Sequence, residues 1–149
     1  HFNNISSSLL TLFVNLKMVG REVINMYVPF NPNPLNKRTD DCVLRALSKA
    51  LNKPWEEVYI DLSLKGLEMA DWGNNNEVWD EYLRDKGFKR EIIPDTCPDC
   101  YTLNDFCKDN PTGEYIICTG SHVIFVKDGN FYDSWNSENV VPIFAYRKE

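Results

Sequence analysis

Hydrophobic residues change their spacing about halfway along this chain of 149 residues, and this change is the strongest constraint on its fold. Between residues 39 and 86 the apolar side chains recur at intervals of three and four, which is typical of helices. From residue 88 onwards they form short runs between turn residues, which is typical of strands. Helices followed by strands predict an α+β domain, with N-terminal helices and then a small antiparallel sheet.

The first half of this pattern predicts three helices. The first extends over residues 39–51, where Thr39 can cap it and acidic residues suit the positive end of the helix dipole. The second begins at Pro54 and runs to about Ser63. The third covers residues 77–86 and is stopped by a glycine.

The second half predicts strands with one short helix among them. The expected elements are a strand over 88–93, a capped helix over 102–108, a long strand over 114–126, a returning strand over 131–135 and a last strand over 140–146. The turn between the long strand and the returning strand contains Asp128-Gly129, which is a strong hairpin signal.

Residues 1–28 differ in composition from the rest of the chain. Residues 1–38 contain four basic residues and one acidic residue, whereas the whole chain has a net charge of −6. A proline-rich connector over 29–34 follows. We therefore expect an N-terminal extension or leader over residues 1–28, with Met26 as an alternative natural start, and a folded domain over residues 29–149.

Charge and composition exclude several classes of function. The chain has 16 basic and 22 acidic residues, the wrong balance for a protein that neutralises nucleic-acid phosphates. Its N-terminal apolar run of about six residues has no basic region before it and is far shorter than the ~20 residues that span a bilayer. We expect a cytoplasmic protein whose partner is a protein or peptide, with no nucleic acid and no membrane.

Histidine is scarce, and this scarcity narrows the search for a catalytic site. His1 opens the chain and His122 is the only other histidine, so a cysteine–histidine mechanism has to use His122. Cys42 lies in the first turn of the first predicted helix, where free N–H groups and the helix dipole stabilise a thiolate. Asp40 and Asp41 oppose that ionisation, so an imidazolium has to outweigh them. The alternative is that His122 is a core histidine bonded to a backbone carbonyl.

The other four cysteines fit a nucleophile less well. Cys118 lies four residues from His122, about 13 Å away if both belong to one strand at ~3.3 Å per residue. Cys107 lies inside the short helix, where a buried structural thiol is the default. Cys97 and Cys100 lie in a loop rich in proline and aspartate.

A third residue is needed to orient the imidazole, and the hairpin register selects Asp133. If Asp128-Gly129 form the centre of the turn, Val126 faces Phe131 and Asp133 lies diagonally across from His122. Asn136 then falls on the other face, and a change of one residue in the loop would reverse this preference.

The order of these residues resembles the papain-like cysteine peptidases, in which a cysteine begins a helix and a histidine and an aspartate follow on strands. The segments Asp-Asp-Cys-Val-Leu-Arg-Ala-Leu (40–47), Thr-Gly-Ser-His-Val (119–123) and Tyr-Asp-Ser-Trp-Asn-Ser (132–137) resemble papain-like proteins of Firmicutes and their phages. The resemblance covers roughly residues 34–146. The papain-like cysteine peptidases place a glutamine for the oxyanion hole six residues before the cysteine, and here Asn36 occupies that position.

This resemblance implies a papain-like domain that hydrolyses an amide or peptide bond through a thiol. Cys42 would be the nucleophile, His122 the base and Asp133 its partner, while the Cys42 N–H and the Asn36 amide would stabilise the oxyanion. No cofactor is required. The alternative is a catalytically silent papain-like module that binds a host or partner protein.

The remaining cysteines leave a metal site open. Cys97 and Cys100 form one Cys-x-x-Cys pair, and Cys107 and Cys118 could supply two further zinc ligands. A second such pair is lacking, so zinc and ordinary reduced thiols both stay open.

Overall fold

A computed structural model of the chain describes residues 26–149. The expectations for residues 1–25 as a leader or extension lie outside this described part.

The described chain combines four helices with one six-stranded sheet, which confirms the α+β class. The helices are α2 (Cys42–Leu51), α3 (Trp55–Met69), α4 (Asn76–Asp85) and α5 (Leu103–Asp109). The strands are β1 (Tyr27–Pro29), β2 (Phe88–Ile92), β3 (Glu114–Cys118), β4 (Val123–Lys127), β5 (Asn130–Asp133) and β6 (Phe144–Lys148).

The strand order in the sheet is β1-β5-β4-β3-β6-β2. Strand β1 pairs with β5 in parallel, whereas the other neighbours are antiparallel. Strand β1 also begins at Tyr27, before the predicted domain boundary at residue 29. The expectation of a purely antiparallel sheet is therefore wrong at this edge, because the segment before the prolines belongs to the domain.

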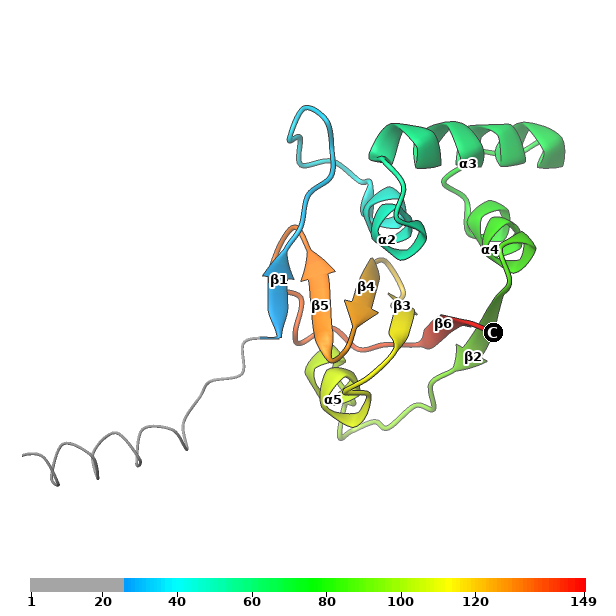
Figure 1. Cartoon of the computed structure of the whole chain (residues 1–149). Coiled ribbons are helices and arrows are strands. Elements are labelled where there is room, and N and C mark those ends of the chain that lie inside the picture. Colours follow the sequence, from blue (N-terminus) through cyan, green and yellow to red (C-terminus); the bar gives the residue numbers. More distant parts are fainter. Residues whose placement is uncertain (1–25) are drawn as a thin grey trace, which may run out of the picture.

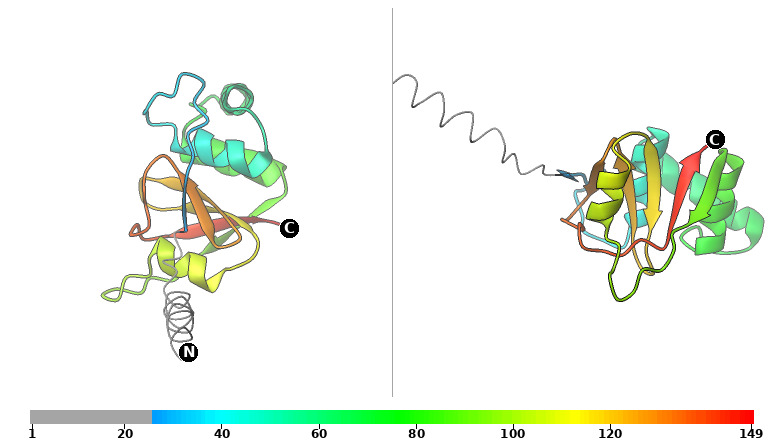
Figure 2. Two further views of the ribbon diagram at one scale, coloured as in Figure 1. Left: turned by 60° about the vertical axis from the view of Figure 1, so that its left-hand side comes forward. Right: turned by 90° about the horizontal axis from the view of Figure 1, so that it is seen from below.

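The helices cover both faces of the sheet (Figure 1). Figure 2 shows α2 above the strands and α5 below them in its left-hand view. Two hydrophobic clusters fill these layers. On the α2 face the side chains of Leu47, Val58, Trp79, Leu83, Ile116, Phe125 and Tyr146 are buried together. On the α5 face the cluster contains Leu103, Phe106, Ile117, Ile124, Val126 and Phe131.

The predicted start holds for α5, whereas α2 begins later than the predicted residue 39. Helix α2 begins at Cys42, but its N-cap is Asp41 rather than Thr39, and the Asp41 side chain makes no capping hydrogen bond. Helix α5 has Thr102 as its N-cap, in a capping box with Asp105. The backbone N–H groups at the start of α2 are therefore left without a side-chain cap.

Helix α3 is longer than predicted and continues from Ser63 to Met69. In the structure, a Cβ on Gly66 would lie 2.6 Å from the Asp71 carbonyl oxygen, so glycine here lets the next loop pack closely against the helix.

The long strand predicted over residues 114–126 is wrong. It is two strands, β3 and β4, joined by a tight turn from Thr119 to His122. The Thr119 hydroxyl oxygen accepts hydrogen bonds from the backbone N–H groups of Ser121 and His122, which closes this turn locally. Cys118 pairs with Val123 across the hairpin, so the 13 Å separation along one strand does not apply.

The hairpin between β4 and β5 has the predicted register. Val126 pairs with Phe131, and Asp128 and Gly129 form the turn with positive φ angles of 48° and 73°. The last strand lies further along than predicted, at Phe144–Lys148, because residues 140–143 instead bond to the backbone of α5, Cys118 and Ile93.

None of the helices within residues 26–149 has the length and apolar character needed to cross a membrane.

Candidate functional site

The start of α2 faces the turn between β3 and β4 and the end of β5. Between them lies a cleft of about 620 Å³, which we call the Cys42 cleft. Its lining includes Arg38, Thr39, Asp40, Cys42, Arg45, Asn74, Asn76, Trp79, Cys118, Thr119, Gly120, Ser121, His122, Ser134 and Trp135. Three of the four predicted catalytic residues, Cys42, His122 and Asp133, are brought together beside this cleft.

Cys42 is the first residue of α2, and its thiol is hydrogen-bonded to the His122 ring. Burial alone would raise the pKa of this thiol. The hydrogen bonds from His122 and from the Val123 N–H, together with the charges of His122 and Arg45, outweigh burial and hold the pKa below its ordinary value. The geometry therefore favours a thiolate at Cys42.

His122 lies between the thiol and a carboxylate. Its Nε2 atom is 2.6 Å from Oδ2 of Asp133, which leaves Nδ1 as the nitrogen available to Cys42. Burial would lower the pKa of His122, but Asp133 and Cys42 raise it to about 9. The indole of Trp135 lies against the imidazole, with ring centroids 5.3 Å apart, and shields one side of it.

Asp133 is held in place by several groups. It is only 2% exposed, and the Ser137 hydroxyl donates to Oδ2 at 2.7 Å while the Ser134 N–H donates to Oδ1 at 2.7 Å. Burial would raise the pKa of this carboxyl, but the hydrogen bonds from His122 and Ser137 lower it below its ordinary value. Asp133 is thus an oriented, ionised partner for the imidazole.

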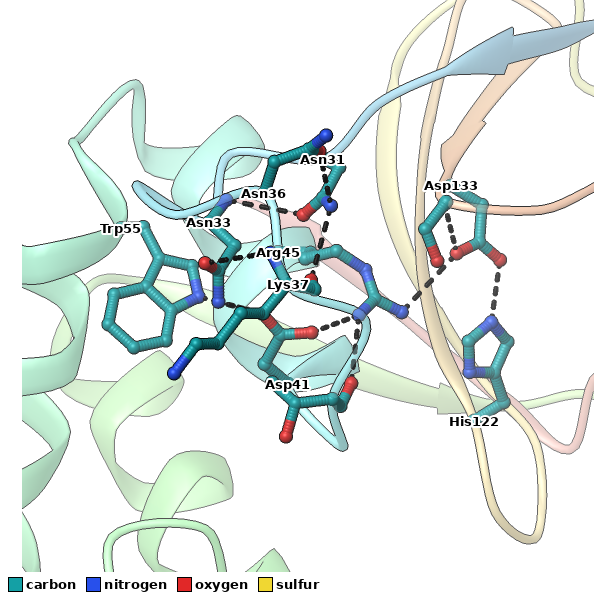
Figure 3. A network of polar contacts seen from close by, with 11 residues as sticks. Asn31, Asn33, Asn36, Lys37, Asp41, Arg45, Trp55, His122 and Asp133 are labelled. Atoms are coloured by element: carbon teal, nitrogen blue, oxygen red, sulfur yellow. Dashed lines mark hydrogen bonds and ion pairs between the residues drawn. The ribbon is translucent and has the colours of Figure 1, made fainter.

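Arg45 connects this carboxylate to the start of α2 (Figure 3). Its Nη2 atom is 3.5 Å from Oδ1 of Asp133, and its Nη1 atom bonds to Oδ1 of Asp41. Asp41 also accepts from the Trp55 indole N–H at 3.0 Å and from the Asn33 amide at 3.3 Å. The negative charge of Asp41, which we expected to oppose the thiolate, is therefore paired with a buried guanidinium.

Asn36 is not part of the site. Its side chain is exposed, its Oδ1 atom accepts a hydrogen bond from the Asn31 amide at 3.0 Å, and it does not line the Cys42 cleft. In Figure 3 it lies on the far side of Arg45 from His122. The expected oxyanion role of Asn36 is wrong because residues 31–37 form a loop closed on itself. The backbone N–H groups in the first turn of α2 remain as donors.

Three residues that the sequence did not predict also contact the site: Arg45, Ser137 and Trp135. A signal for Arg45 was present, since it is a charged residue on an otherwise apolar helix face and lies four residues after Asp41. No local signal distinguishes Ser137 or Trp135 from ordinary loop residues.

The cysteines proposed as zinc ligands are not brought together. The free thiols of Cys97 and Cys100 share a hydrogen bond in an exposed loop, whereas Cys107 is buried on the α5 face and Cys118 on the α2 face. The sheet separates the two buried thiols. Among residues 26–149 no group of three or more His, Cys, Asp or Glu side chains is arranged to hold a metal ion.

These other thiols also differ from Cys42 in acidity. Burial raises the pKa of Cys107 to about 11 and also raises that of Cys118. The hydrogen bond with Asp95 raises the pKa of Cys97.

Comparisons with known proteins give no match to a family model, a curated protein or a solved structure.

Proposed function

We propose that this protein is a cysteine-dependent amide or peptide hydrolase with a papain-like arrangement of its catalytic residues. One observation carries the proposal: the thiol of Cys42, at the first position of a helix, bonds to His122, which bonds to the buried carboxylate of Asp133. Nucleophile, base and orienting group are thus in contact in the order that acyl transfer requires.

The reaction follows from these contacts in two stages. The Cys42 thiolate attacks the substrate carbonyl, and the protonated His122 gives its proton to the leaving amine as the C–N bond breaks. A water molecule then attacks the thioester, with His122 taking its proton, and the C–S bond breaks to release the acid and regenerate the thiolate. Asp133 keeps the ring oriented throughout.

In each attack, negative charge develops on the carbonyl oxygen of the substrate, and this oxygen lies near the start of α2. The helix has no side-chain cap there, so its first N–H groups are free to donate to that oxygen. The pathway needs a reduced thiol, and Cys42 is free, which fits a reducing compartment such as the cytoplasm.

A second candidate function is a catalytically silent module of the same architecture that binds a host or partner protein. It is favoured by the position of Asn36, because the side-chain amide expected to stabilise the oxyanion does not line the Cys42 cleft. A protein of this kind would retain the cleft but would not turn over a substrate.

Thiol alkylation separates the two functions. We expect iodoacetamide to modify Cys42 faster than the other four cysteines at pH 6–7, below the ~8.5 pKa of a free thiol, as followed by intact mass and peptide mapping. His122→Ala should remove this advantage. Asp133→Asn should weaken it more than the control Asn136→Ala does. Slow alkylation that does not depend on residue 122 would favour the silent module.

Hydrolysis itself needs a second measurement. A mixture of unstructured peptides incubated with the protein should give new termini that are absent with Cys42→Ala. Fast alkylation of Cys42 without any cleavage would contradict the peptidase assignment.

A further inference from the structure

A second cleft, of about 610 Å³, lies directly beside the Cys42 cleft. The two clefts share Thr39, Asp40 and Asn74, so an extended ligand can occupy both across this common rim. We call it the aromatic cleft. Its lining includes Asp40, Trp55, Tyr59, Leu67, Asp71 and Trp72.

The walls of the aromatic cleft are apolar and open to solvent. Trp55 and Tyr59 stack on each other, with ring centroids 5.3 Å apart. Leu67 and Trp72 are 78% and 81% exposed, which is unusual for side chains of this size. The cleft thus presents flat aromatic and aliphatic surface that nothing in the described chain covers.

The loop that carries Trp72 is fixed against α3. A Cβ on Gly73 would lie 2.6 Å from the Leu62 carbonyl oxygen, so only glycine permits this approach of the two backbones. The Asp71 carboxylate accepts hydrogen bonds from the Trp72 N–H and from the Asn75 amide. The wall of the cleft is therefore formed before any ligand arrives.

The charged residues in this lining are all acidic. They are Asp40, Asp41 and Asp71, and the lining contains no lysine or arginine. Asp41 is paired with Arg45, but neither Asp40 nor Asp71 forms an ion pair with any residue of the part described. The cleft therefore has uncompensated negative charge beside aromatic faces.

We propose that the aromatic cleft binds a long basic side chain, arginine or lysine, of a peptide substrate whose carbonyl lies at Cys42. This inference rests on the proposed function and names its substrate class. The aliphatic stem of such a side chain packs on Leu67 and Tyr59, and its cationic end contacts the Trp72 face and the carboxylates of Asp40 and Asp71. An acidic side chain meets like charge in the same place.

Peptidyl probes test the charge requirement directly. Short acetylated peptides ending in an acyloxymethyl ketone, a group that alkylates catalytic thiols, are prepared with arginine, citrulline or glutamate at each position in turn. Arginine and citrulline have nearly the same shape and differ in charge. At one position we expect the arginine probe to label Cys42 at least about tenfold faster than the citrulline probe, with glutamate slowest.

Substitutions of the lining residues test whether the preference for arginine over citrulline arises in the aromatic cleft. Trp72→Ala and Leu67→Ala should each reduce labelling by the arginine probe severalfold, and Asp40→Asn should narrow the ratio of arginine to citrulline. Leu64→Ala is the matched control, because Leu64 is an exposed leucine of the same helix that does not line the cleft. It should behave as the unmodified protein does.

Two further measurements keep this inference separate from the proposed function. The iodoacetamide rate reports the thiol alone, so a slow rate contradicts the proposed function and not the cleft. In Cys42→Ala, an arginine peptide with an adjacent photoreactive diazirine should cross-link to residues 67–74, as mapped by mass spectrometry. Equal labelling by arginine and citrulline at every position, or cross-links only outside this segment, would overturn the inference.

Discussion

Arg45 offers a sharp test of how the site is held together, because it is a buried cation between two buried carboxylates. Replacement by methionine keeps most of its length and removes its charge. The side chains of Arg45, Asp41 and Asp133 are 8%, 3% and 2% exposed. Removal of one member of a buried ion pair costs about 3–5 kcal/mol, because the remaining charge loses its partner without regaining water.

This cost can be converted into a thermal midpoint. At roughly 2–4 °C per kcal/mol for a chain of this size, Arg45→Met should lower the midpoint by about 6–20 °C. The assay is urea and thermal denaturation followed by tryptophan fluorescence and circular dichroism. Arg84→Met is the matched control, since Arg84 also pairs with an aspartate four residues earlier but is 54% exposed. Arg84→Met should lower the free energy of unfolding by no more than about 1 kcal/mol.

The pH dependence of the Arg45→Met variant provides an independent check. The pKa of Asp133 is below its ordinary value in the folded protein, so this carboxylate stabilises the fold at neutral pH, and that stabilisation is lost as the pH falls below the ordinary carboxyl range. Without the guanidinium the folded-state pKa of Asp133 is lowered less, so Arg45→Met has less of this stabilisation to lose. The difference in unfolding free energy between the unmodified protein and Arg45→Met should therefore shrink from pH 7 to about pH 3. A cost equal to that of Arg84→Met at both pH values would refute the buried-network reasoning.

Three further predictions concern the same site and the cysteine loop. The pKa of His122 is raised from 6.5 to about 9, so protonated His122 stabilises the folded protein fully below about pH 6.5, and this stabilisation should be lost as the pH rises through 9. In a series of urea denaturations across this pH range, His122→Ala should not show that loss. The same pH dependence of the unfolding free energy in both proteins would contradict this prediction. Ser137→Ala removes a buried donor to Asp133 and should lower the free energy of unfolding, measured in urea, by about 1–3 kcal/mol. The control Ser134→Ala should lower it by less than about 0.5 kcal/mol. Equal losses in the two variants would contradict the hydrogen bond between Ser137 and Asp133. Elemental analysis should find well under one zinc per chain, with no change of thermal midpoint in EDTA; stoichiometric zinc would show that a site exists.

Much of the local structure could be predicted from short stretches of sequence. The pattern over residues 39–51 was enough to place Cys42 in the first turn of a helix, because helix starts and apolar faces depend on residues within a few positions of each other. The pair Asp128-Gly129 fixed the hairpin register, since both residues have to adopt positive φ. The capping box of α5 was equally local.

The errors occurred where local signals compete. Residues 114–126 have enough β-branched and aromatic residues for one strand, but hydrogen bonds to the Thr119 hydroxyl close a turn that makes them a hairpin. This turn also changes the side of the sheet that His122 reaches. Strict alternation along β4 would place it with Ile124 on the α5 face, whereas the turn lets it contact Cys42 on the α2 face.

The sequence by itself determined which residue types could carry chemistry: one internal histidine, one cysteine at a helix start and an aspartate at the end of a hairpin strand. Only the tertiary structure decided which of them meet. Arg45 reaches Asp133 across 88 positions of sequence, and Asn36 turns away from the cleft although it occupies the expected position. The physical reason is range: caps, turns and helix faces depend on neighbouring residues, whereas contacts between α2 and the strand ends depend on how the buried side chains pack between them.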